Sequence, residues 1–427
     1  MKQKQGTLEG ANISAANIDY TVNMFFKTSM DELSYGGDQL QPLLFQDDIS
    51  RLATSLWGAQ SGNNKMESVM ETKLLDFNLD KSCVIVMGSV KRKAEIDEQM
   101  KENPLKLCGQ KMKYVLKEKY LGDYLSSGGL SDSVQATVAK RKGQVVTSIL
   151  EAKAVIEDCR SNVVGGITAG LEIWELAILP FLLNNSDTWV EISKSTIDTL
   201  DDLQFMFYRY LLATPRTCPI PALLWETGGL LMEHRIAYKK ILFYHHLINL
   251  PTNTLAYEIA ATQTTMSYPG LMVECANLME KYEIPDVKIY NKIQWKKLVK
   301  KKVTGQNRAD ILENVNKNYK KLDHEVLRYE NCDKKEYLSS LNLPDARLKF
   351  ALRAKMTKTV QMNFKGEPNF IKNGWKCQDC DLPDTQDHII RCPCYKQLRE
   401  GKNLIRVKDL VDYFRKVIQI RDKCNER

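Results

Sequence analysis

The sequence predicts an α+β protein with three successive parts: a small α/β part, a long and mostly α-helical region, and a short metal-binding module. Two short apolar runs flank a helical pattern near the N-terminus, helical periodicity dominates from about residue 130, and a Cys/His cluster lies at 377–394. At 427 residues the chain is longer than one usual compact domain, and 43% hydrophobic residues are enough to fill real cores. We place the three parts at 1–125, 126–370 and 371–427.

The N-terminal part follows the order strand, helix, strand. Residues 42–49 (PLLFQDDI) form an apolar run that ends in two acids, and residues 82–87 (SCVIVM) form a second, β-branched run. Between them, apolar residues recur at helical spacing over 63–76. Short links between such elements predict part of an α/β sheet.

The middle region is helical by its periodicity. One apolar stripe keeps a period of about 3.6 residues through an otherwise polar segment: Val134, Val138, Val145, Ile149 and Ile156. Residues 196–213 show the same pattern, and Ser195 is the expected N-cap. A further helical stretch is expected at 231–249.

The Cys/His cluster has the spacing Cys377-x2-Cys380-x7-His388-x3-Cys392. Thiolates and one imidazole around a tight C-x-x-C pair suit a tetrahedral Zn²⁺ ion. Cys394 is an alternative to Cys392 as the fourth ligand. The competing interpretation is that these residues are unrelated to one another.

A basic segment precedes this cluster. Six lysines and one tryptophan lie together without an acid: Lys292, Trp295, Lys296, Lys297, Lys300, Lys301 and Lys302. Lysines can neutralise phosphates while an aromatic ring stacks on a base, which predicts nucleic-acid binding. The alternative is a solvated helix face with Ile293 and Leu298 buried beneath it.

The overall charge and the cysteines bear on partners and compartment. Lys and Arg outnumber Asp and Glu by 61 to 53, a net charge of +8, which permits a polyanionic partner without requiring one. No segment has the apolar length of a signal peptide or of a membrane span. The 11 cysteines are mostly scattered, which favours reduced thiols. We therefore expect an intracellular protein, nuclear or cytoplasmic, without a membrane partner.

The acids at 45–48 (Phe45-Gln46-Asp47-Asp48) end the first apolar run. Nucleotidyl transfer with two metal ions needs carboxylates that hold Mg²⁺ against phosphate oxygens, and adjacent acids at a hairpin tip can do this. Taken alone the pair also fits an ordinary exposed turn, so its neighbours along the chain matter.

Several motifs in order resemble reverse transcriptases of non-LTR (LINE-type) retrotransposons. They are KQGTLEGA (4–11), FQDD (45–48), NLDKS (78–82), YLG (120–122), ALLWETGG (222–229) and the Cys/His cluster. The resemblance implies that Asp47 and Asp48 are catalytic Mg²⁺ ligands. It also implies that Gln5 and Gly6 contact template and nucleotide.

The same resemblance assigns roles to three further residues. Lys81 would protonate the leaving pyrophosphate, unless it is a solvated lysine at a strand start. Tyr120 and Gly122 would touch the primer.

The family resemblance implies a fold and a function. The fold is a reverse-transcriptase palm, a helical thumb and connecting region, and a zinc knuckle that binds Zn²⁺. The function is RNA-directed DNA polymerase, with RNA and DNA as partners and dNTPs as substrates. In the family the first catalytic aspartate and the fingers precede the Gln-Gly motif, and here Met1 stands almost directly before it. We therefore expect a truncated palm that is inactive alone, or, as the alternative, a non-catalytic nucleic-acid-binding protein that uses the helical region and the zinc knuckle.

Overall fold

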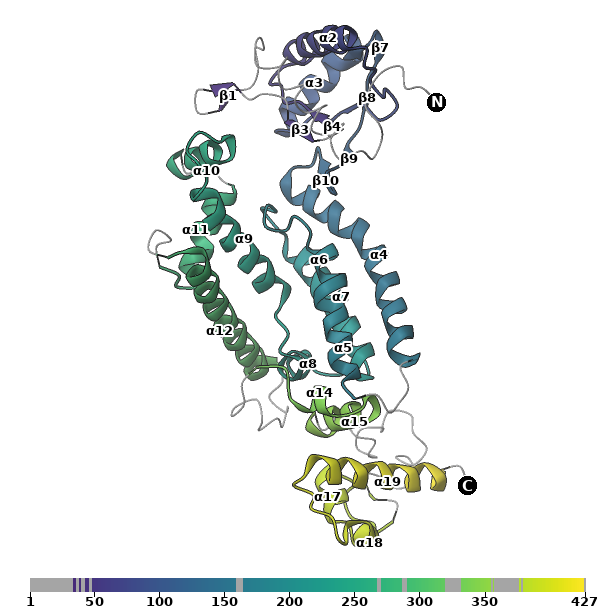
Figure 1. The fold of residues 1–427 in the computed structure, drawn as a ribbon. Coiled ribbons are helices and arrows are strands. Elements are labelled where there is room, and N and C mark those ends of the chain that lie inside the picture. The colour runs from purple at the N-terminus through teal and green to yellow at the C-terminus, as the bar shows by residue number, and fades with distance from the viewer. Residues whose placement is uncertain are drawn as a thin grey trace, which may run out of the picture.

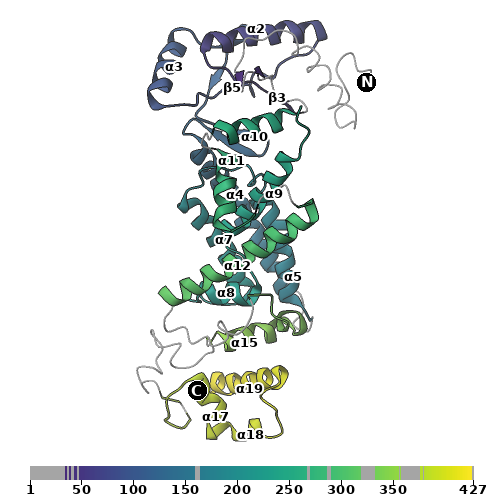
Figure 2. The ribbon, with the colours of Figure 1, turned by 90° about the vertical axis from the view of Figure 1, so that its left-hand side faces the viewer.

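A computed structural model gives the fold of the chain. It describes residues 34–35, 38–39, 43–45, 48–158, 164–266, 270–285, 290–318, 332–354, 356, 376–377 and 379–425. These residues are mostly helical with few short strands, which is compatible with the expected α+β class. Figures 1 and 2 show an elongated arrangement, with the small strands at one end, the long helices in the middle and the C-terminal helices at the other end.

The strands of the N-terminal end pair two by two. The pairs are β1 (Ser34–Tyr35) with β2 (Asp38–Gln39), β3 (Leu43–Phe45) with β4 (Asp48–Ser50), β6 (Lys106–Leu107) with β7 (Gln110–Lys111), and, in parallel, β5 (Cys83–Val84) with β8 (Lys113–Tyr114). The strand expected at 42–49 is therefore a hairpin, β3–β4. Every sheet in the described ranges has two strands, so a larger palm-like sheet is not seen there and the palm stays a prediction.

Two helices accompany these strands, α2 (Leu56–Lys73) and α3 (Val90–Glu102). Each begins at a serine whose hydroxyl accepts a backbone N–H: Ser55 accepts from Gly58 at 3.0 Å, and Ser89 accepts from Arg92 at 3.3 Å. α2 contains most of the helix expected at 63–76. The Asn63 amide on α2 donates to the Lys106 carbonyl at 2.9 Å, which ties β6 to the helix.

A tight hairpin joins this end to the long helices. It is formed by β9 (Lys117–Tyr120) and β10 (Asp123–Ser126), with Leu121 and Gly122 both at positive φ in the turn. This is the geometry of a type I′ turn, whose twist matches that of the strands. The predicted boundary between residues 125 and 126 falls inside β10, which packs on the next helix, α4.

The helices of residues 130–353 form what we call the helical body. Its elements are α4 (Leu130–Asp158), α5 (Gly166–Ile173), a π-helix (Trp174–Ile178), α6 (Leu179–Leu182), α7 (Lys194–Leu212), α8 (Ile220–Thr227), α9 (Met232–Ile248), α10 (Leu255–Met266), α11 (Leu271–Lys281), α12 (Lys292–Asn318), α14 (Tyr337–Ser340) and α15 (Leu343–Arg353). The stripe predicted from Val134 to Ile156 is buried in its main core, together with the large rings of Trp174 and Trp225. The helix expected at 231–249 is confirmed as α9.

The start of α7 differs from the prediction. The Ser193 hydroxyl, not that of Ser195, accepts the Thr196 N–H at 3.2 Å and caps the helix, and Ser195 lies in its first turn. Both serines suit a cap locally, so the sequence did not distinguish two starts that differ by two residues.

Four helices form the second half of the body. α9 and α12 pack along each other, and α10 and α11 contact α9 (Figure 1). Between α9 and α12 a separate apolar cluster includes Ile241, Tyr282, Trp295 and Val299. No helix in the described ranges is both long enough and apolar enough to cross a membrane.

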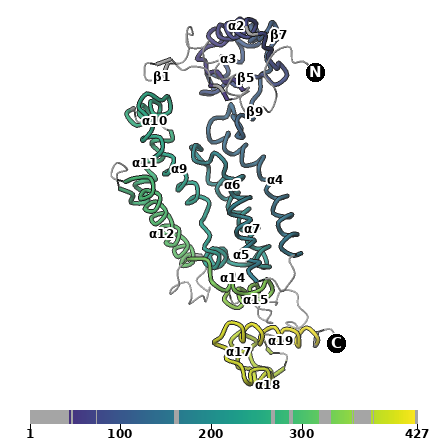
Figure 3. The backbone as a smooth tube through the Cα atoms, in the orientation of Figure 1, coloured from purple at the N-terminus to yellow at the C-terminus, as the bar shows by residue number. Residues whose placement is uncertain are grey.

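Residues 376–425, which we call the C-terminal module, lie beyond α15 (Figure 3). The module contains α17 (Gln386–Arg391), a 3₁₀ turn (Pro393–Tyr395), α18 (Lys396–Arg399) and α19 (Val407–Asn425). α19 packs on α15, where Arg415 forms an ion pair with Asp345. The Gln386 amide also donates to the Leu352 carbonyl at 2.8 Å. The predicted boundary between residues 370 and 371 lies outside the described residues.

Candidate metal centre

Four metal-ligating side chains converge in the C-terminal module. Cys377, Cys380, His388 and Cys392 each offer one ligand atom, and these atoms lie within 4.8 Å of one another. The Sγ atoms of Cys380 and Cys392 are 3.7 Å apart, and Cys380 Sγ is 3.1 Å from His388 Nε2. Two thiolates bound tetrahedrally to zinc would be about 3.8 Å apart. The cluster can therefore hold a metal ion such as Zn²⁺.

One loop and one short helix bring these ligands together. The Cys377 N–H donates to the Leu382 carbonyl at 2.6 Å and closes the loop that carries the first two cysteines. The Thr385 hydroxyl accepts the His388 N–H at 3.0 Å, which caps α17 and puts the histidine in its first turn. Cys392 is the residue at which α17 ends. These local hydrogen bonds hold the loop and the helix in the conformations that bring the four ligand side chains together.

The structure decides between the two candidates for the fourth ligand. Cys392 is buried and belongs to the cluster, whereas Cys394 is exposed and its Sγ donates to the Asp379 carbonyl at 3.1 Å. The His-x3-Cys spacing places Cys392 at the helix end beside His388. Two residues later, in the 3₁₀ turn, the chain has left the cluster.

An arginine from the C-terminal helix contacts one of the candidate ligands and the residues next to the cluster. Arg421 on α19 donates from both terminal nitrogens to the fully buried Asp384, at 2.9 and 3.0 Å. Its Nε donates to the Tyr395 hydroxyl at 2.9 Å, and one terminal nitrogen lies 3.4 Å from Cys377 Sγ. The Tyr395 hydroxyl in turn donates to the Asp379 carboxylate. Such contacts behind the ligands orient them and raise metal affinity.

The sequence reasoning missed Arg421, although a signal was present. Arg421 follows the buried Val417 by four residues, so it falls on the same face of α19 as the apolar residues. A cation on a buried stripe indicates a buried acid on the facing element, because an unpaired buried charge is very costly.

Burial affects the protonation of two of the candidate metal ligands. It raises the pKa of the Cys377 thiol and that of the Cys392 thiol above the usual cysteine value. Without a metal these thiols therefore keep their protons at neutral pH. Binding of a divalent cation requires the thiolates and releases the protons.

Of the two predicted Mg²⁺ ligands, the structure describes Asp48, which belongs to the N-terminal end of the molecule. Asp48 is exposed and begins β4 opposite Phe45, at the connection of the hairpin. Asp47 lies outside the described residues, as do Gln5 and Gly6. Within the described ranges only the Cys/His cluster gathers three or more His, Cys, Asp or Glu ligands around one position, so the structure gives the Mg²⁺ prediction no support.

The other predicted polymerase residues are surface features. Lys81 is exposed in a turn just before β5. This position also fits the alternative interpretation, a solvated lysine at a strand start. Tyr120 ends β9, and Gly122 lies in the tight turn of the β9–β10 hairpin. The buried Arg141 of α4 donates to the Gly122 carbonyl at 2.8 Å and fixes that turn on the helical body. The predicted contacts of these residues with substrate stay predictions.

The basic segment forms the first turns of α12, and one of its residues needs a correction. Trp295 is 1% exposed, and its Nε1–H donates to the Ile241 carbonyl at 3.3 Å. Its ring is part of the α9–α12 core and is not free to stack on a base. The burial of Ile293 expected in the alternative interpretation is also wrong, because this side chain is 69% exposed.

Unlike the buried tryptophan, the lysines of the segment are exposed or half-buried. Five of them are exposed along α12: Lys292, Lys296, Lys297, Lys300 and Lys301. Lys302 is half-buried and pairs with Glu283 at 3.2 Å. Phosphate binding by this set stays a prediction.

Comparison with known proteins adds no assignment. No protein-family model matches the chain, and a search of curated proteins finds no match. The geometry of the cluster therefore carries the functional argument.

Proposed function

We propose that this protein is a nucleic-acid-binding protein of the non-LTR reverse transcriptase kind, with a structural zinc knuckle in its C-terminal module. The observation that carries the proposal is the convergence of Cys377, Cys380, His388 and Cys392. The ordered motifs described above and the exposed lysines of α12 agree with it. RNA or DNA would be the partner.

The site is suited to a structural ion. Four protein ligands close a tetrahedral shell and leave no position for a substrate, which is typical of structural zinc. Among the described residues, the small apolar core of the module has eight buried members, seven from the module itself and Leu352 from α15, and two of them, Cys377 and Cys392, are ligands themselves. Metal binding would therefore supply much of the module's folding free energy.

The test measures metal and nucleic acid on the full chain. We expect one equivalent of zinc by elemental analysis, and Co²⁺ substitution should give the absorption of a tetrahedral three-sulfur, one-nitrogen site. Cys380→Ser should lose the metal, whereas Cys394→Ser, the same change outside the cluster, should retain it. Absence of stoichiometric metal in the unaltered chain would refute the zinc knuckle.

The binding role has its own measurement. The unaltered protein should shift a single-stranded RNA or DNA probe in a gel assay, and the affinity should fall as salt rises. Protein that holds zinc but binds neither probe would contradict the nucleic-acid role while leaving the metal centre intact.

A second candidate is polymerase activity, and its basis is the resemblance of the FQDD motif (45–48) to that of reverse transcriptases. Asp48 stands at the start of β4 beside the short connection, where a metal-binding carboxylate would be needed. Primer extension on an RNA template with Mg²⁺ or Mn²⁺, lost in Asp48→Asn, would support this candidate. Without extension by the unaltered chain, binding alone remains the proposed function.

A further inference from the structure

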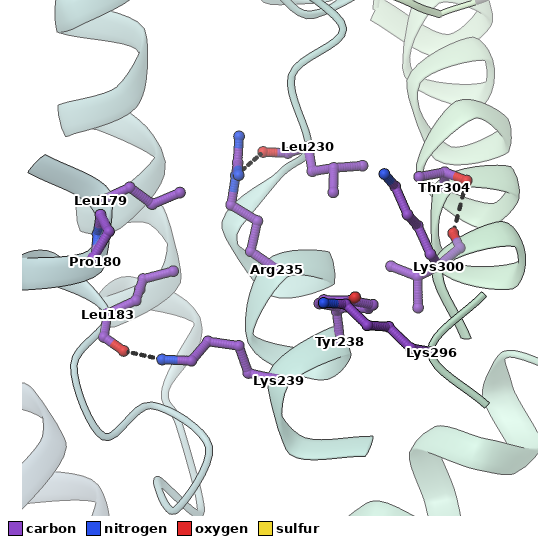
Figure 4. Close-up of a pocket in the computed structure, with 11 residues that line it drawn as sticks. Leu179, Pro180, Leu183, Leu230, Arg235, Tyr238, Lys239, Lys296, Lys300 and Thr304 are labelled. Atoms are coloured by element: carbon purple, nitrogen blue, oxygen red, sulfur yellow. Dashed lines mark hydrogen bonds between the residues drawn. The ribbon is translucent and has the colours of Figure 1, made fainter. Parts of the chain in front are cut away.

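A cleft lies within the helical body, away from the metal centre. It has a volume of about 410 Å³ and lies between α6, α9 and α12. Figure 4 shows α9 between the two walls, with leucines and a proline from α6 on one side and lysines from α12 on the other. The volume falls within the range typical of ligand pockets, about 300–1,000 Å³.

The α6 wall is apolar and locally irregular. Leu179, Pro180 and Leu183 line it, directly after the π-helix Trp174–Ile178. Such π-helical turns occur frequently at functional sites. This turn also contains Glu175. Its carboxylate accepts hydrogen bonds from both terminal nitrogens of Arg235, at 2.7 and 3.0 Å.

The remaining lining contains four cationic residues and no acid, together with the uncharged Leu230, Tyr238, Val303 and Thr304. Arg235 and Lys239 come from α9, and Lys296 and Lys300 come from α12. Arg235 is occupied by Glu175, and Lys239 donates to the Leu183 carbonyl at 2.5 Å. Within the described part of the chain, Lys296 and Lys300 form no ion pair, and both are exposed. Two cationic groups are thus available for an anion beside an apolar surface.

An aromatic ring completes this arrangement. Tyr238 of α9 lines the cleft and is half-buried, and Figure 4 shows it beside Lys296. The sequence suggested Trp295 as the stacking partner of the lysines, but that ring is buried. Tyr238 supplies an aromatic group on the facing helix, in a position that sequence adjacency does not reveal.

We propose that this cleft binds one segment of a single-stranded nucleic acid, with Lys296 and Lys300 on its phosphates and Tyr238 against a base. The proposal rests on the proposed function and adds a specific site to it, separate from the zinc knuckle. Neighbouring cations and an aromatic surface are the usual elements of single-strand recognition, because the lysines neutralise the backbone and the ring accepts any base.

The test compares two charge-matched double variants on the full chain. Lys296→Gln/Lys300→Gln removes the cleft cations, and Lys297→Gln/Lys301→Gln removes two exposed cations of the same helix that do not line the cleft. Anisotropy titrations use a fluorescein-labelled oligo(dT) strand at several salt concentrations. We expect the cleft pair to weaken binding roughly tenfold and to lower the salt slope by about 1.4, and the control pair to weaken it about twofold or less.

A second pair of variants tests the ring. Tyr238→Ala should weaken oligo(dT) binding by about five- to a hundredfold, whereas Tyr238→Phe, which keeps the ring, should bind like the unaltered chain. Because Tyr238 also packs on the α9–α12 core, circular dichroism and melting of Tyr238→Phe and Tyr238→Ala must accompany the titrations.

The outcomes separate the two proposals. If the unaltered chain does not bind oligo(dT) or an RNA strand, the proposed function fails and the cleft proposal fails with it. If it binds and both lysine pairs weaken binding equally, the charge acts diffusely and only the cleft proposal is overturned. If adenosine monophosphate binds in a Lys296- and Lys300-dependent way while strand binding is unaffected, the cleft is a site for a free nucleotide and the strand proposal is wrong.

Discussion

The helical body and the C-terminal module are stabilised in different ways. The main core of the body joins residues from α4 to α15 and buries large rings, such as Trp174, which stacks on Phe207 at 5.2 Å between ring centroids. The module's core is far smaller and is built around its metal ligands and the buried pair of Arg421 and Asp384. Apolar burial therefore dominates the body, whereas the module combines a small core with a buried charge pair and, as we propose, a bound metal ion.

The difference shows how a small unit compensates for a small core. The apolar core of the module is small, and small domains commonly add a bound metal to such a core. The two regions also meet, since Leu352 of α15 belongs to the module's core. Loss of the metal should therefore destabilise the module first. Within the body, only the end around α15 should be affected.

The largest expected effect is metal removal. Structural zinc contributes on the order of 10 kcal/mol or more in zinc-finger peptides. Chelation should therefore strip hydrogen-exchange protection from residues 379–425 while α7 stays protected. Unchanged protection of the module in a metal-free protein would contradict its dependence on the ion.

The second effect concerns the buried charge pair. Arg421→Met removes the cation that pairs with the buried Asp384, which should destabilise the module by about 3–5 kcal/mol. The double variant Arg421→Met/Asp384→Leu removes both charges and should recover much of that loss. Thermal melts of both variants, followed by a probe in the module, check the prediction; equal losses would indicate that the arginine acts through packing alone.

A matched experiment addresses the body. Trp174→Ala removes a fully buried ring and should cost about 3–5 kcal/mol in the free energy of unfolding. Trp174→Phe keeps a ring against Phe207 and removes an indole N–H that finds no hydrogen-bond acceptor among the described residues, so its cost should be clearly smaller. Urea denaturation measures both, and zinc content should stay at one equivalent in each.

A smaller effect in the body depends on pH. Burial raises the pKa of Asp201 from 3.8 to about 6, even though its carboxylate accepts the Met232 N–H at 2.9 Å at the start of α9. The pKa of Asp201 is higher in the folded chain than in the unfolded chain. Its contribution to the stability of the folded state is therefore fully present below about pH 4 and is lost as pH rises through about 6. Asp201→Asn keeps the acceptor and should be more stable than the unaltered chain at pH 7, by about 1–3 kcal/mol. Melting curves across this window should converge at low pH.

The smallest effect is expected on the surface of α7. Lys194 and Asp198 form an exposed pair at 3.0 Å, and such pairs on a helix contribute little. Lys194→Ala should change the free energy of unfolding by about 0.5 kcal/mol or less. A loss as large as that of Trp174→Ala would show that exposed charges, rather than burial, stabilise this part of the body.

Much of the local structure could be predicted from the sequence. The stripe from Val134 to Ile156 and the helix at 231–249 follow from periodicity, because the period of a helix fixes which side chains share a face. The ligand set at Cys377, Cys380 and His388 follows from the chemistry that zinc requires at close spacing. The strand at 42–49 was less predictable, since a short apolar run does not show where a hairpin turns.

Several helices, the mostly helical character of the middle region and the Cys/His ligand set could thus be predicted, because these depend on residues close along the chain. The burial of Trp295 and the position of Tyr238 in the cleft could not be predicted in this way, since both depend on which helix packs against α12. The same holds for Arg421, which meets Asp384 across 37 positions of chain. The choice of Cys392 over Cys394 depended on how α17 ends. Contacts between distant residues arise from packing in three dimensions, and no local pattern records them.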